Sequence, residues 1–375
     1  MKILILANND AGLFKFRKEL LEELVKHHQV YISVPDGEFV SDIKALGCRT
    51  GTCSFLDRRG TNPFHDIKLL LYYGRLLKKI RPDLVFTYTI KPNVYGGLAC
   101  RKYHVPYVAN ITGLGSAVEN GGILQKITLF LYKAGLRNAQ KVFFQNTENR
   151  DFFLKNKIVT VPYGLLPGSG VNLMQHCFEV YPEDTDELVF TTVGRIMKDK
   201  GTDELLRAAE TIKRKFPKIR FRMVGFFDDQ YEDVIRKAVK SGIVEYTGQQ
   251  RDIHPFITES HAIIHPSYHE GMSNVLLEAA AAGRPVLASD IPGCRETFDE
   301  GTSGLGFAPQ DTESLVQAIE KFIRLPYEKK VQMGQMGRRK MEQEFDRRKV
   351  VEKYMEETEK IMKEQETCSQ GYMKN

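Results

Sequence analysis

Short runs of β-branched and aromatic residues alternate along the chain with segments whose apolar residues have helical spacing. The runs predict strands at residues 2–7, 30–35, 83–88, 107–112, 141–146 and 158–164, and again at 188–194, 220–226, 244–248, 262–267, 285–290 and 304–309. In the second half, the intervening segments predict helices at residues 200–216, 230–241, 250–260, 273–283 and 311–324. Alternating strands and helices are typical of a parallel, doubly wound sheet. Because this alternation occurs in both halves of the chain, the sequence predicts an α/β protein with two Rossmann-like domains.

The expected domain boundary is an acidic, aperiodic segment that contains a proline, residues 177–188 (CFEVYPEDTDEL). This composition is typical of a linker. It divides an N-terminal domain, residues 1–176, from a C-terminal domain, residues 189–345. We expect residues 346–375 to form a helix that returns to the N-terminal domain and ends in a frayed tail. We also expect the two domains to face each other across a cleft at the carboxyl ends of their strands, where such folds bind ligands.

Charge differs strongly between the two halves. Residues 1–165 contain 24 Lys and Arg against 13 Asp and Glu, a net charge of +11, whereas the remaining residues contain 30 against 35, a net charge of −5. The asymmetry indicates that the N-terminal half meets an anionic partner such as phosphate, acidic lipid or nucleic acid. The first residues, MKILILANND, suit a buried strand better than a signal peptide, and no apolar run reaches the length of a membrane span. These features predict a cytoplasmic protein.

Two carboxylates stand out in the segment HEGMSNVLLEAAAAGRPVLASD, residues 269–290. Glu278 lies among small apolar residues of a predicted helix, where an unpaired carboxylate is costly to desolvate. Ser273 is placed to cap that helix, and Gly271 allows a close approach of the backbone, so the free N–H groups predict a site for a phosphate or diphosphate. Glu278 can then bind vicinal hydroxyls such as those of a ribose, while Glu270 lies near the group that the diphosphate carries.

A second cluster of charges supports a diphosphate site. The segment VGRIMKDKG, residues 193–201, follows a predicted strand and places Arg195 and Lys200 at the same edge of the sheet. An arginine and a lysine together can neutralise a leaving diphosphate without a metal ion. Each cluster alone also fits ordinary surface charges, but their combination favours a binding site.

Other motifs do not predict a metal or cofactor site. The triplet DTD, residues 184–186, resembles a metal-binding motif but lies in the predicted linker rather than after a strand. The segment GLGSAV, residues 113–118, nearly matches a dinucleotide fingerprint, but Val118 replaces the third glycine. Six cysteines lack CxxC spacing, and the only histidines with HxxxH spacing, His261, His265 and His269, lie on or beside a predicted strand and its loop, where packing or a backbone contact is favoured over a metal ion. We therefore expect neither a bound metal nor a cofactor.

These segments resemble the family 4, GT-B glycosyltransferases. In the C-terminal half the resemblance rests on residues 193–201, 245–253 (EYTGQQRDI) and 265–307, with two glutamates separated by seven residues. In the N-terminal half, YTIKPNVYGG, NITGLGS and VPYGLLPGSGVN resemble the branch that builds bacterial capsule, O-antigen and lipid-linked oligosaccharides. The resemblance covers nearly the whole chain. It implies the GT-B architecture and sugar transfer with retention of anomeric configuration.

The resemblance also implies roles for individual residues. Arg195 and Lys200 would act on the diphosphate, Glu270 on the transferred sugar, and Glu278 on the ribose. The other donor-binding residues that it implies are Gly12, Gly248, Gly271, Met272, Ser273, Asn274, Gly293 and Glu296. The chain departs from the family at the end of the fourth strand, where many members have His-x-His and this sequence has Tyr88 and Lys91. The candidates for sugar or acceptor contacts are Lys91, Asn93, Thr112, Gly113 and Gly115.

The segment ILQKITLFLYKAGLRNAQK, residues 123–141, combines an apolar stripe with basic residues at helical spacing. The pattern fits either a core helix with a solvated back or a helix that lies on an acidic membrane. The charge of its domain, and the lack of an aromatic platform for single-stranded bases, favour an anionic membrane over nucleic acid. We therefore expect Lys126, Lys133 and Arg137 to contact the inner face of the plasma membrane.

Together, the sequence predicts a retaining transferase that moves a hexose or N-acetylhexosamine from a UDP-sugar to a polyprenyl-diphosphate-linked saccharide. The expected context is the assembly of a bacterial surface polysaccharide or glycan. Two alternatives stay open: a GT-B nucleotide-sugar epimerase and a catalytically inactive saccharide-binding subunit. An epimerase converts the donor without an acceptor, and an inactive subunit binds the donor without turnover.

Overall fold

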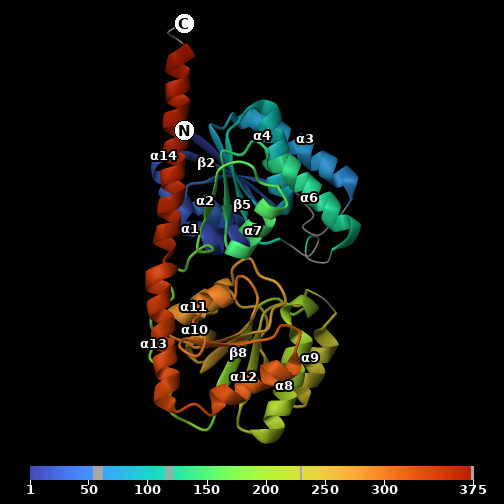
Figure 1. Cartoon of the computed structure of the whole chain (residues 1–375), viewed down its shortest axis with the longest axis vertical. Helices are drawn as coiled ribbons and strands as arrows, with labels where there is room; N and C mark the ends of the chain where they lie inside the picture. The colour runs from blue at the N-terminus through green and yellow to red at the C-terminus, as the bar shows by residue number, and fades with distance from the viewer. Residues whose placement is uncertain (54–61, 115–117, 119–120, 229, 373–375) are drawn as a thin grey trace. The chain divides into compact units, whose positions relative to one another are not determined.

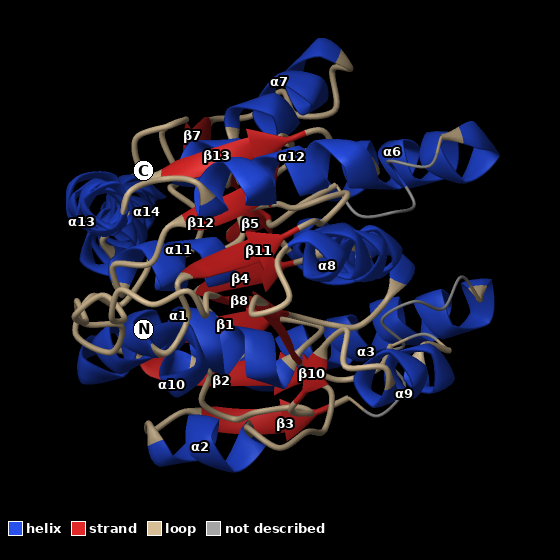
Figure 2. Ribbon diagram, turned by 90° about the horizontal axis from the view of Figure 1, so that it is seen from below, coloured by secondary structure: helices blue, strands red, loops and turns tan. Residues whose placement is uncertain are grey.

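The computed structural model describes residues 1–53, 62–114, 118, 121–228 and 230–372, which form two α/β units (Figure 1). One unit comprises Met1–Ser169 together with Arg347–Asn375, and the other comprises Gly170–Asp346. The first contains a seven-stranded sheet in the order β3-β2-β1-β4-β5-β6-β7, and the second a six-stranded sheet in the order β10-β9-β8-β11-β12-β13. Every pair of neighbouring strands is parallel, and helices flank both faces of each sheet (Figure 2). The predicted fold class is confirmed.

The elements of the first unit follow the predicted alternation. Its strands are β1 (Lys2–Leu6), β2 (Gln29–Val34), β3 (Arg49–Thr52), β4 (Leu84–Tyr88), β5 (Tyr107–Ile111), β6 (Lys141–Phe144) and β7 (Tyr163–Leu165). Its helices are α1 (Asp10–His27), α2 (Val40–Ala45), α3 (Pro63–Ile80), the π-helical η1 (Pro92–Gly96), α4 (Gly97–Tyr103), α6 (Gly122–Leu136), α7 (Thr147–Lys155) and α14 (Arg347–Tyr372).

The second unit repeats the pattern. Its strands are β8 (Val189–Val193), β9 (Arg220–Val224), β10 (Glu245–Tyr246), β11 (Ala262–His265), β12 (Val286–Ser289) and β13 (Gly304–Phe307). Its helices are η2 (Lys198–Lys200), α8 (Thr202–Lys215), α9 (Glu232–Lys240), α10 (His254–Thr258), α11 (Asn274–Ala281), η3 (Arg295–Thr297), α12 (Thr312–Ile323) and α13 (Tyr327–Glu344). Among the described residues, none of these or the preceding helices combines the length and apolar character that a membrane-spanning helix requires.

Helices cover both faces of the first sheet. Successive side chains of a strand point to opposite faces, so nearly all of those in the central strands are buried. In β1, Ile3 and Ile5 join the core beneath α1, α2 and α14, whereas Leu4 and Leu6 join the core beneath α3, α4 and α6. This explains why the strands read as continuous apolar runs rather than as an alternating pattern.

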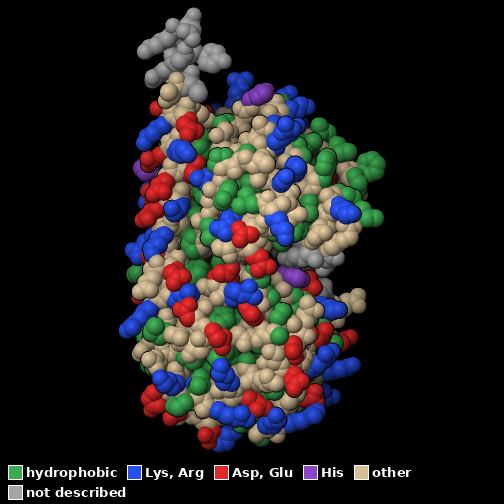
Figure 3. Space-filling model, viewed as in Figure 1, with side chains coloured by type: hydrophobic (Ala, Val, Ile, Leu, Met, Phe, Trp, Pro, Cys, Tyr) green, Lys and Arg blue, Asp and Glu red, His purple; other side chains and the backbone are tan. Residues whose placement is uncertain are grey.

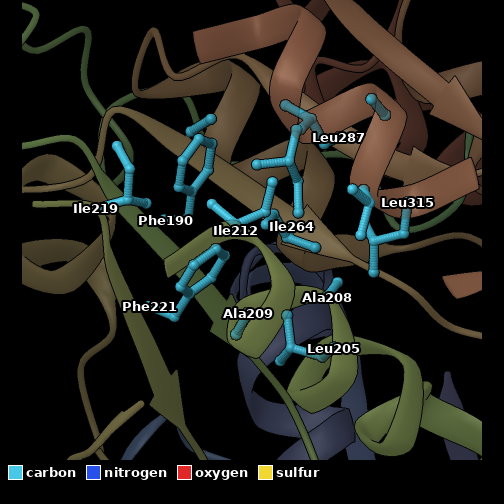
Figure 4. Packing of buried hydrophobic residues seen from close by; sticks show 14 of the residues in the cluster. Phe190, Leu205, Ala208, Ala209, Ile212, Ile219, Phe221, Ile264, Leu287 and Leu315 are labelled. Atoms are coloured by element: carbon cyan, nitrogen blue, oxygen red, sulfur yellow. The ribbon is translucent and has the colours of Figure 1, made fainter. Parts of the chain in front are cut away.

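The second unit has its main core where α8 and α12 pack on the sheet. Phe190 and Phe221 of neighbouring strands stack with ring centroids 5.6 Å apart, and Leu205 and Ile212 of α8 lie against the same cluster (Figure 4). Residues 205, 208, 209 and 212 recur at the spacing of one helical face, and all four are buried. This packing fixes the first turn of α8 next to the loop that leaves β8.

The boundary between the units differs from the predicted linker. Residues 177–188 belong to the second unit, where Tyr181 is buried and donates a hydrogen bond to the His261 carbonyl oxygen at 2.7 Å. The fully buried Arg284 donates to the carbonyl oxygens of Glu179 (3.0 Å) and Val180 (2.7 Å). These bonds hold the acidic segment on its sheet, so the first unit ends at Ser169. Helix α14, in turn, packs against α1 in the first unit.

Candidate active site

The candidate site of the second unit is built by two loops that leave neighbouring strands. Arg195 follows β8 and Lys200 ends η2 in the same loop, while Glu270 lies in the loop between β11 and α11. Strands β8 and β11 are parallel neighbours, so their carboxyl ends meet at one edge of the sheet. A small hollow at this edge is lined by Arg195, Lys200 and the last residue of β11, His265. The structure thus brings the three predicted catalytic side chains to one edge of one sheet.

Glu270 and Lys200 form an ion pair through Glu270 Oε1. The same oxygen lies 2.8 Å from His265 Nε2, and Lys200 Nζ also lies 3.3 Å from the Ser267 hydroxyl oxygen. An ionised carboxylate only accepts hydrogen bonds, so His265 donates from Nε2. The Glu270 carboxylate is therefore held in position by two donors from separate elements.

The environment keeps Glu270 ionised. Burial alone would raise the pKa of the Glu270 carboxyl, but the Lys200 ammonium and the hydrogen bond from His265 outweigh burial and hold this pKa well below its usual range. The group is consequently a carboxylate at neutral and mildly acidic pH. It can accept hydrogen bonds from a sugar, but it does not supply a proton.

Arg195 is paired as well, with Asp228. Asp228 lies in the loop after β9, which is the other parallel neighbour of β8. The two loops are joined by backbone bonds from Ile196 N to Phe226 O (2.8 Å) and from Asp228 N to Ile196 O (3.2 Å). Both candidate diphosphate-binding cations are therefore held by carboxylates, and an incoming diphosphate would compete with those carboxylates for the cations.

Two glycines allow the loops to approach each other closely. Gly201 has a φ of +67°, and a Cβ there would lie 2.0 Å from the Pro266 carbonyl oxygen. Gly293 has a φ of +79°, and a Cβ there would lie 2.6 Å from the Gly271 carbonyl oxygen. A side chain at either position would force the loop around Glu270 apart. Gly293 therefore supports the site through its backbone, which also accepts from Ser273 N at 2.8 Å.

Helix α11 begins beside this loop, as the sequence predicts. Ser273 stands at the N-cap position, but its side chain makes no capping bond, and its buried hydroxyl oxygen has no hydrogen-bond partner among the described residues. Glu278, one turn into the helix, is buried, and its Oε1 lies 3.7 Å from His176 Nε2. The buried carboxylate at Glu278 therefore has an imidazole neighbour from the start of the second unit.

The other predicted donor-binding residues occupy different settings. The side chain of Met272 packs in a core cluster with Leu277 and Met341, and its predicted donor contact stays a prediction. The Glu296 carboxylate accepts from Gly293 N at 2.7 Å, which places both in the loop beside α11. Gly271 and Asn274 flank Met272 and Ser273, and Gly248 follows β10 with a φ of +73°.

Gly12 lies in the other unit, in the first turn of α1, where its N–H donates to Asn9 Oδ1 at 2.5 Å.

The predicted acceptor contacts lie in the first unit. Asn93 is fully buried, with its Oδ1 accepting from Thr87 Oγ1 at 2.6 Å and its Nδ2 donating to Asn110 O at 2.9 Å. In contrast to the prediction, its side chain serves the core rather than an acceptor site. Lys91 Nζ pairs with Asp66 Oδ1 at 2.9 Å. Thr112 and Gly113 follow β5 and are half-buried, and Gly115 lies outside the described residues.

The predicted membrane contacts Lys126, Lys133 and Arg137 are exposed on and just after α6. Predicted apolar residues of this segment divide into two groups. Leu136 is buried, but Ile123 is mostly exposed and Ile127 is half exposed, so the core uses only part of the apolar pattern of α6.

A further cluster, absent from the sequence prediction, joins Cys177, Glu179 and His254. Their possible metal-ligand atoms lie within 4.8 Å of one another. The Cys177 thiol donates to Glu179 Oε1 at 3.1 Å, and His254 Nε2 lies 3.0 Å from the same oxygen. These contacts join the three side chains through Glu179 Oε1, while the buried His254 Nδ1 has no hydrogen-bond partner among the described residues.

The sequence did not reveal the partners of the catalytic residues. Asp228, His265 and Ser267 come from loops and a strand that are distant in sequence from Arg195 and Lys200. The only available signal was position, because each lies at the carboxyl end of a predicted strand. Asp228, for example, belongs to the segment GFFDD, residues 225–229.

Comparisons with known proteins agree with this architecture. Residues 2–146 match the Glycosyl transferase 4-like family, and residues 174–340 match the Glycosyl transferases group 1 family. The sucrose-phosphate synthase of Thermosynechococcus elongatus has a similar structure, with a TM-score of 0.80 and 21% identity over 96% of this chain and 99% of that chain. HepE of Anabaena in complex with UDP and glucose has a TM-score of 0.77 and 18% identity over 96% of this chain and 99% of that chain.

Two bacterial relatives are each 26% identical to this chain over the part that aligns. The N,N'-diacetylbacillosaminyl-diphospho-undecaprenol alpha-1,3-N-acetylgalactosaminyltransferase of Campylobacter jejuni is 26% identical over 86% of this chain and 89% of its own length. The UDP-Gal:alpha-D-GlcNAc-diphosphoundecaprenol alpha-1,3-galactosyltransferase of Escherichia coli is 26% identical over 70% of this chain and 71% of its own length. With both halves matched to glycosyltransferase families and both units matched to GT-B structures, the chain belongs to the family 4-like, GT-B glycosyltransferases.

Proposed function

We propose that this glycosyltransferase moves a hexose or N-acetylhexosamine from a UDP-sugar to a polyprenyl-diphosphate-linked saccharide, with retention of anomeric configuration. The observation that carries the proposal is the cluster of Arg195, Lys200 and Glu270 at the carboxyl edge of the second sheet. The names of the two bacterial relatives, which act on undecaprenyl-diphosphate-linked sugars, support the acceptor class.

The donor would bind in three parts. Its diphosphate would lie between Arg195, Lys200 and the N-terminus of α11, where N–H groups and the unbonded Ser273 hydroxyl favour an anion. The ribose would lie against Glu278, whose carboxylate accepts hydrogen bonds from vicinal hydroxyls. The sugar would lie against Glu270, which His265 and Lys200 already orient.

Transfer on one face of the sugar needs no separate protein base. The acceptor oxygen forms a bond to the anomeric carbon as the bond from that carbon to the diphosphate oxygen breaks. The departing oxygen takes the proton of the acceptor hydroxyl, and Arg195 and Lys200 stabilise the charge that develops on the diphosphate. Because Glu270 is a carboxylate, its role is to position the sugar and to stabilise positive charge on the ring.

The acceptor class implies work at a membrane surface. A polyprenyl chain stays in the bilayer, so the enzyme must reach the diphosphate-linked saccharide at the headgroup level. The exposed Lys126, Lys133 and Arg137 belong to the half with a net charge of +11, which favours an anionic surface. The proposed location is the inner face of the plasma membrane.

Removal of divalent ions is expected to leave transfer essentially intact. Arg195 and Lys200 occupy the place where a divalent ion would otherwise neutralise the diphosphate. Initial rates with and without excess EDTA test this, with a metal-dependent glycosyltransferase as the control. Complete loss in EDTA that Mn²⁺ restores would contradict the assignment of the diphosphate site.

Incubation with a panel of UDP-sugars separates the proposal from its alternatives. The proposed transferase forms product only when a lipid-diphosphate saccharide is present. Conversion of the donor sugar without acceptor would identify an epimerase. Saturable binding of UDP-sugars without turnover on any acceptor extract would identify an inactive subunit.

A further inference from the structure

Large exposed apolar side chains are concentrated on two helices of the first unit. On α3, Phe64 is 80% exposed, Ile67 56% and Leu71 57%. On α6, Ile123 is 78% exposed, Leu124 45%, Ile127 50% and Phe130 71%. Single exposed apolar residues are ordinary, but a concentration of this kind marks an interaction surface.

Each helix carries these residues as a continuous stripe. Residues 64, 67 and 71 have the spacing i, i+3, i+7, and residues 123, 127 and 130 have the spacing i, i+4, i+7, so each set lies along one side of its helix. A different set faces the core, namely Leu69, Tyr73 and Leu77 on α3, and Thr128, Tyr132 and Leu136 on α6. Folding of the unit therefore accounts for the inner stripe of each helix but leaves the outer stripe unexplained.

The two helices lie in the same layer of the unit. Both contact η1, and α4 packs against each of them. Figure 3 shows apolar side chains gathered over α3 and the adjoining part of α6, with lysine and arginine side chains among them. We call these two outer stripes, Phe64, Ile67 and Leu71 with Ile123, Leu124, Ile127 and Phe130, the apolar ridges.

The fully exposed charges on α3 and α6 are all positive. Helix α6 has no Asp or Glu, and its Lys126 and Lys133 are exposed. Helix α3 exposes Lys68, Arg75, Lys78 and Lys79, while its single acid, Asp66, pairs with Lys91. Apolar residues interleaved with cations complement an anionic bilayer, because the apolar groups enter the acyl boundary and the cations stay with the headgroups.

We propose that the apolar ridges insert into the interfacial region of an anionic lipid bilayer. This inference deepens the membrane part of the proposed function and rests on it for the acceptor's location. It also changes the mode of attachment, since surface cations alone give binding that salt abolishes, whereas inserted apolar side chains give binding that persists in high salt.

Flotation of the full chain with vesicles tests the insertion. The probes are vesicles of phosphatidylcholine alone and of phosphatidylcholine with about one third phosphatidylglycerol, each in low and high salt. One variant carries Phe64→Ser, Ile67→Ser, Ile123→Ser and Phe130→Ser, and a second carries Lys126→Glu, Lys133→Glu and Arg137→Glu. The matched control changes Val234 and Val239 of α9 to Ser, because these are exposed apolar residues of the second unit, 44% and 42% exposed.

The wild type and the α9 control are expected to float with anionic vesicles, and part of this binding should survive high salt. The ridge variant should lose at least tenfold in vesicle partitioning in both salts, because its apolar anchors are gone. The charge-reversal variant should lose binding mainly in low salt. Equal partitioning of the ridge variant and the wild type would overturn the inference. If the wild type is a dimer that does not bind vesicles, and the ridge variant is a monomer, the ridges would instead form a contact between two copies of this chain.

Turnover of a short, water-soluble acceptor analogue distinguishes this inference from the proposed function. Both surface variants should retain that turnover, since none of their residues is placed in the donor site. Flotation without turnover of any UDP-sugar would support insertion of the apolar ridges and would contradict the proposed transferase activity. Turnover without flotation would refute the insertion and leave the transferase in place.

Discussion

Lys200→Ala is expected to lower kcat for sugar transfer by about 100- to 1000-fold, the loss that follows removal of one preorganised donor from a developing anion. Lys200 is the cation next to both Glu270 and the hollow at the ends of β8 and β11. Its ammonium would interact most strongly with the diphosphate as the bond to the sugar breaks, because negative charge then develops on the diphosphate oxygen. The donor KM should therefore change much less than kcat.

This substitution also leaves the partly buried Glu270 carboxylate without its ammonium partner, so stability must be followed together with activity. Loss of one partner of a fully buried pair costs about 3 to 5 kcal/mol, and this pair, whose side chains are 20% and 15% exposed, should lose less. The double variant Lys200→Ala, Glu270→Gln removes the stranded charge and should recover thermal stability without recovering kcat. Lys198→Ala, an exposed neighbour on η2, is the matched control and should retain activity. Recovery of transfer in the double variant would show that the first loss was one of folding.

The two glutamates are expected to affect different kinetic constants. Glu270→Gln should lower kcat by about 100-fold with little change in donor KM, because its charge acts on the reacting sugar. Glu278→Gln should raise the donor KM by about tenfold with a smaller effect on kcat, since a ribose contact is present in ground and transition states alike. Steady-state kinetics with the donor varied at saturating acceptor give both constants.

Glu328→Gln on the surface of α13 controls for the loss of a carboxylate, and it should leave both constants unchanged. Calorimetric titration with UDP adds a direct measurement of nucleotide affinity. Equal rises in donor KM for Glu270→Gln and Glu278→Gln, or an unchanged affinity for UDP in Glu278→Gln, would contradict the division of roles.

Much of the fold follows from local patterns. Strands buried on both faces read as continuous apolar runs, so β1, β4, β5 and β8 were predicted to within a residue or two. The edge strand β3, RTGT, was missed because it lacks an apolar run and contains Gly51. Helix α10 is shorter than predicted, since Pro255 suits only the first turn of a helix and Asp252 and Ile253 precede it outside the helix.

The candidate site was predicted by residue type and position but not by contacts. Placement after parallel strands was enough to bring Arg195, Lys200 and Glu270 to one edge. The carboxylate that holds Arg195 comes from another strand's loop, and which side chains meet there depends on loop paths that no local pattern records. For the same reason Asn93, predicted as an acceptor contact, proved to bridge β4 and β5 within the core.

The exposed stripe on α6 shows a third limit. The spacing of Ile123, Leu124, Ile127, Leu131 and Leu136 predicts one apolar face, yet the helix buries only part of it. The packing of α4 and η1 fixes the rotation of α6, so Tyr132 and Leu136 face inward while Ile123 and Phe130 face outward. Helical periodicity alone cannot determine which of two apolar sides meets the sheet.

The most direct test of the central claim is the anomeric configuration of the product, measured by NMR. The wild type would be incubated in EDTA with a UDP-sugar labelled with ¹³C at its anomeric carbon and a short polyprenyl-diphosphate-linked saccharide. The proposed mechanism predicts an acceptor-dependent product whose new linkage keeps the α configuration of the donor, with UDP released in equal amount. A β-linked product, or a labelled sugar whose configuration changes without acceptor, would contradict it.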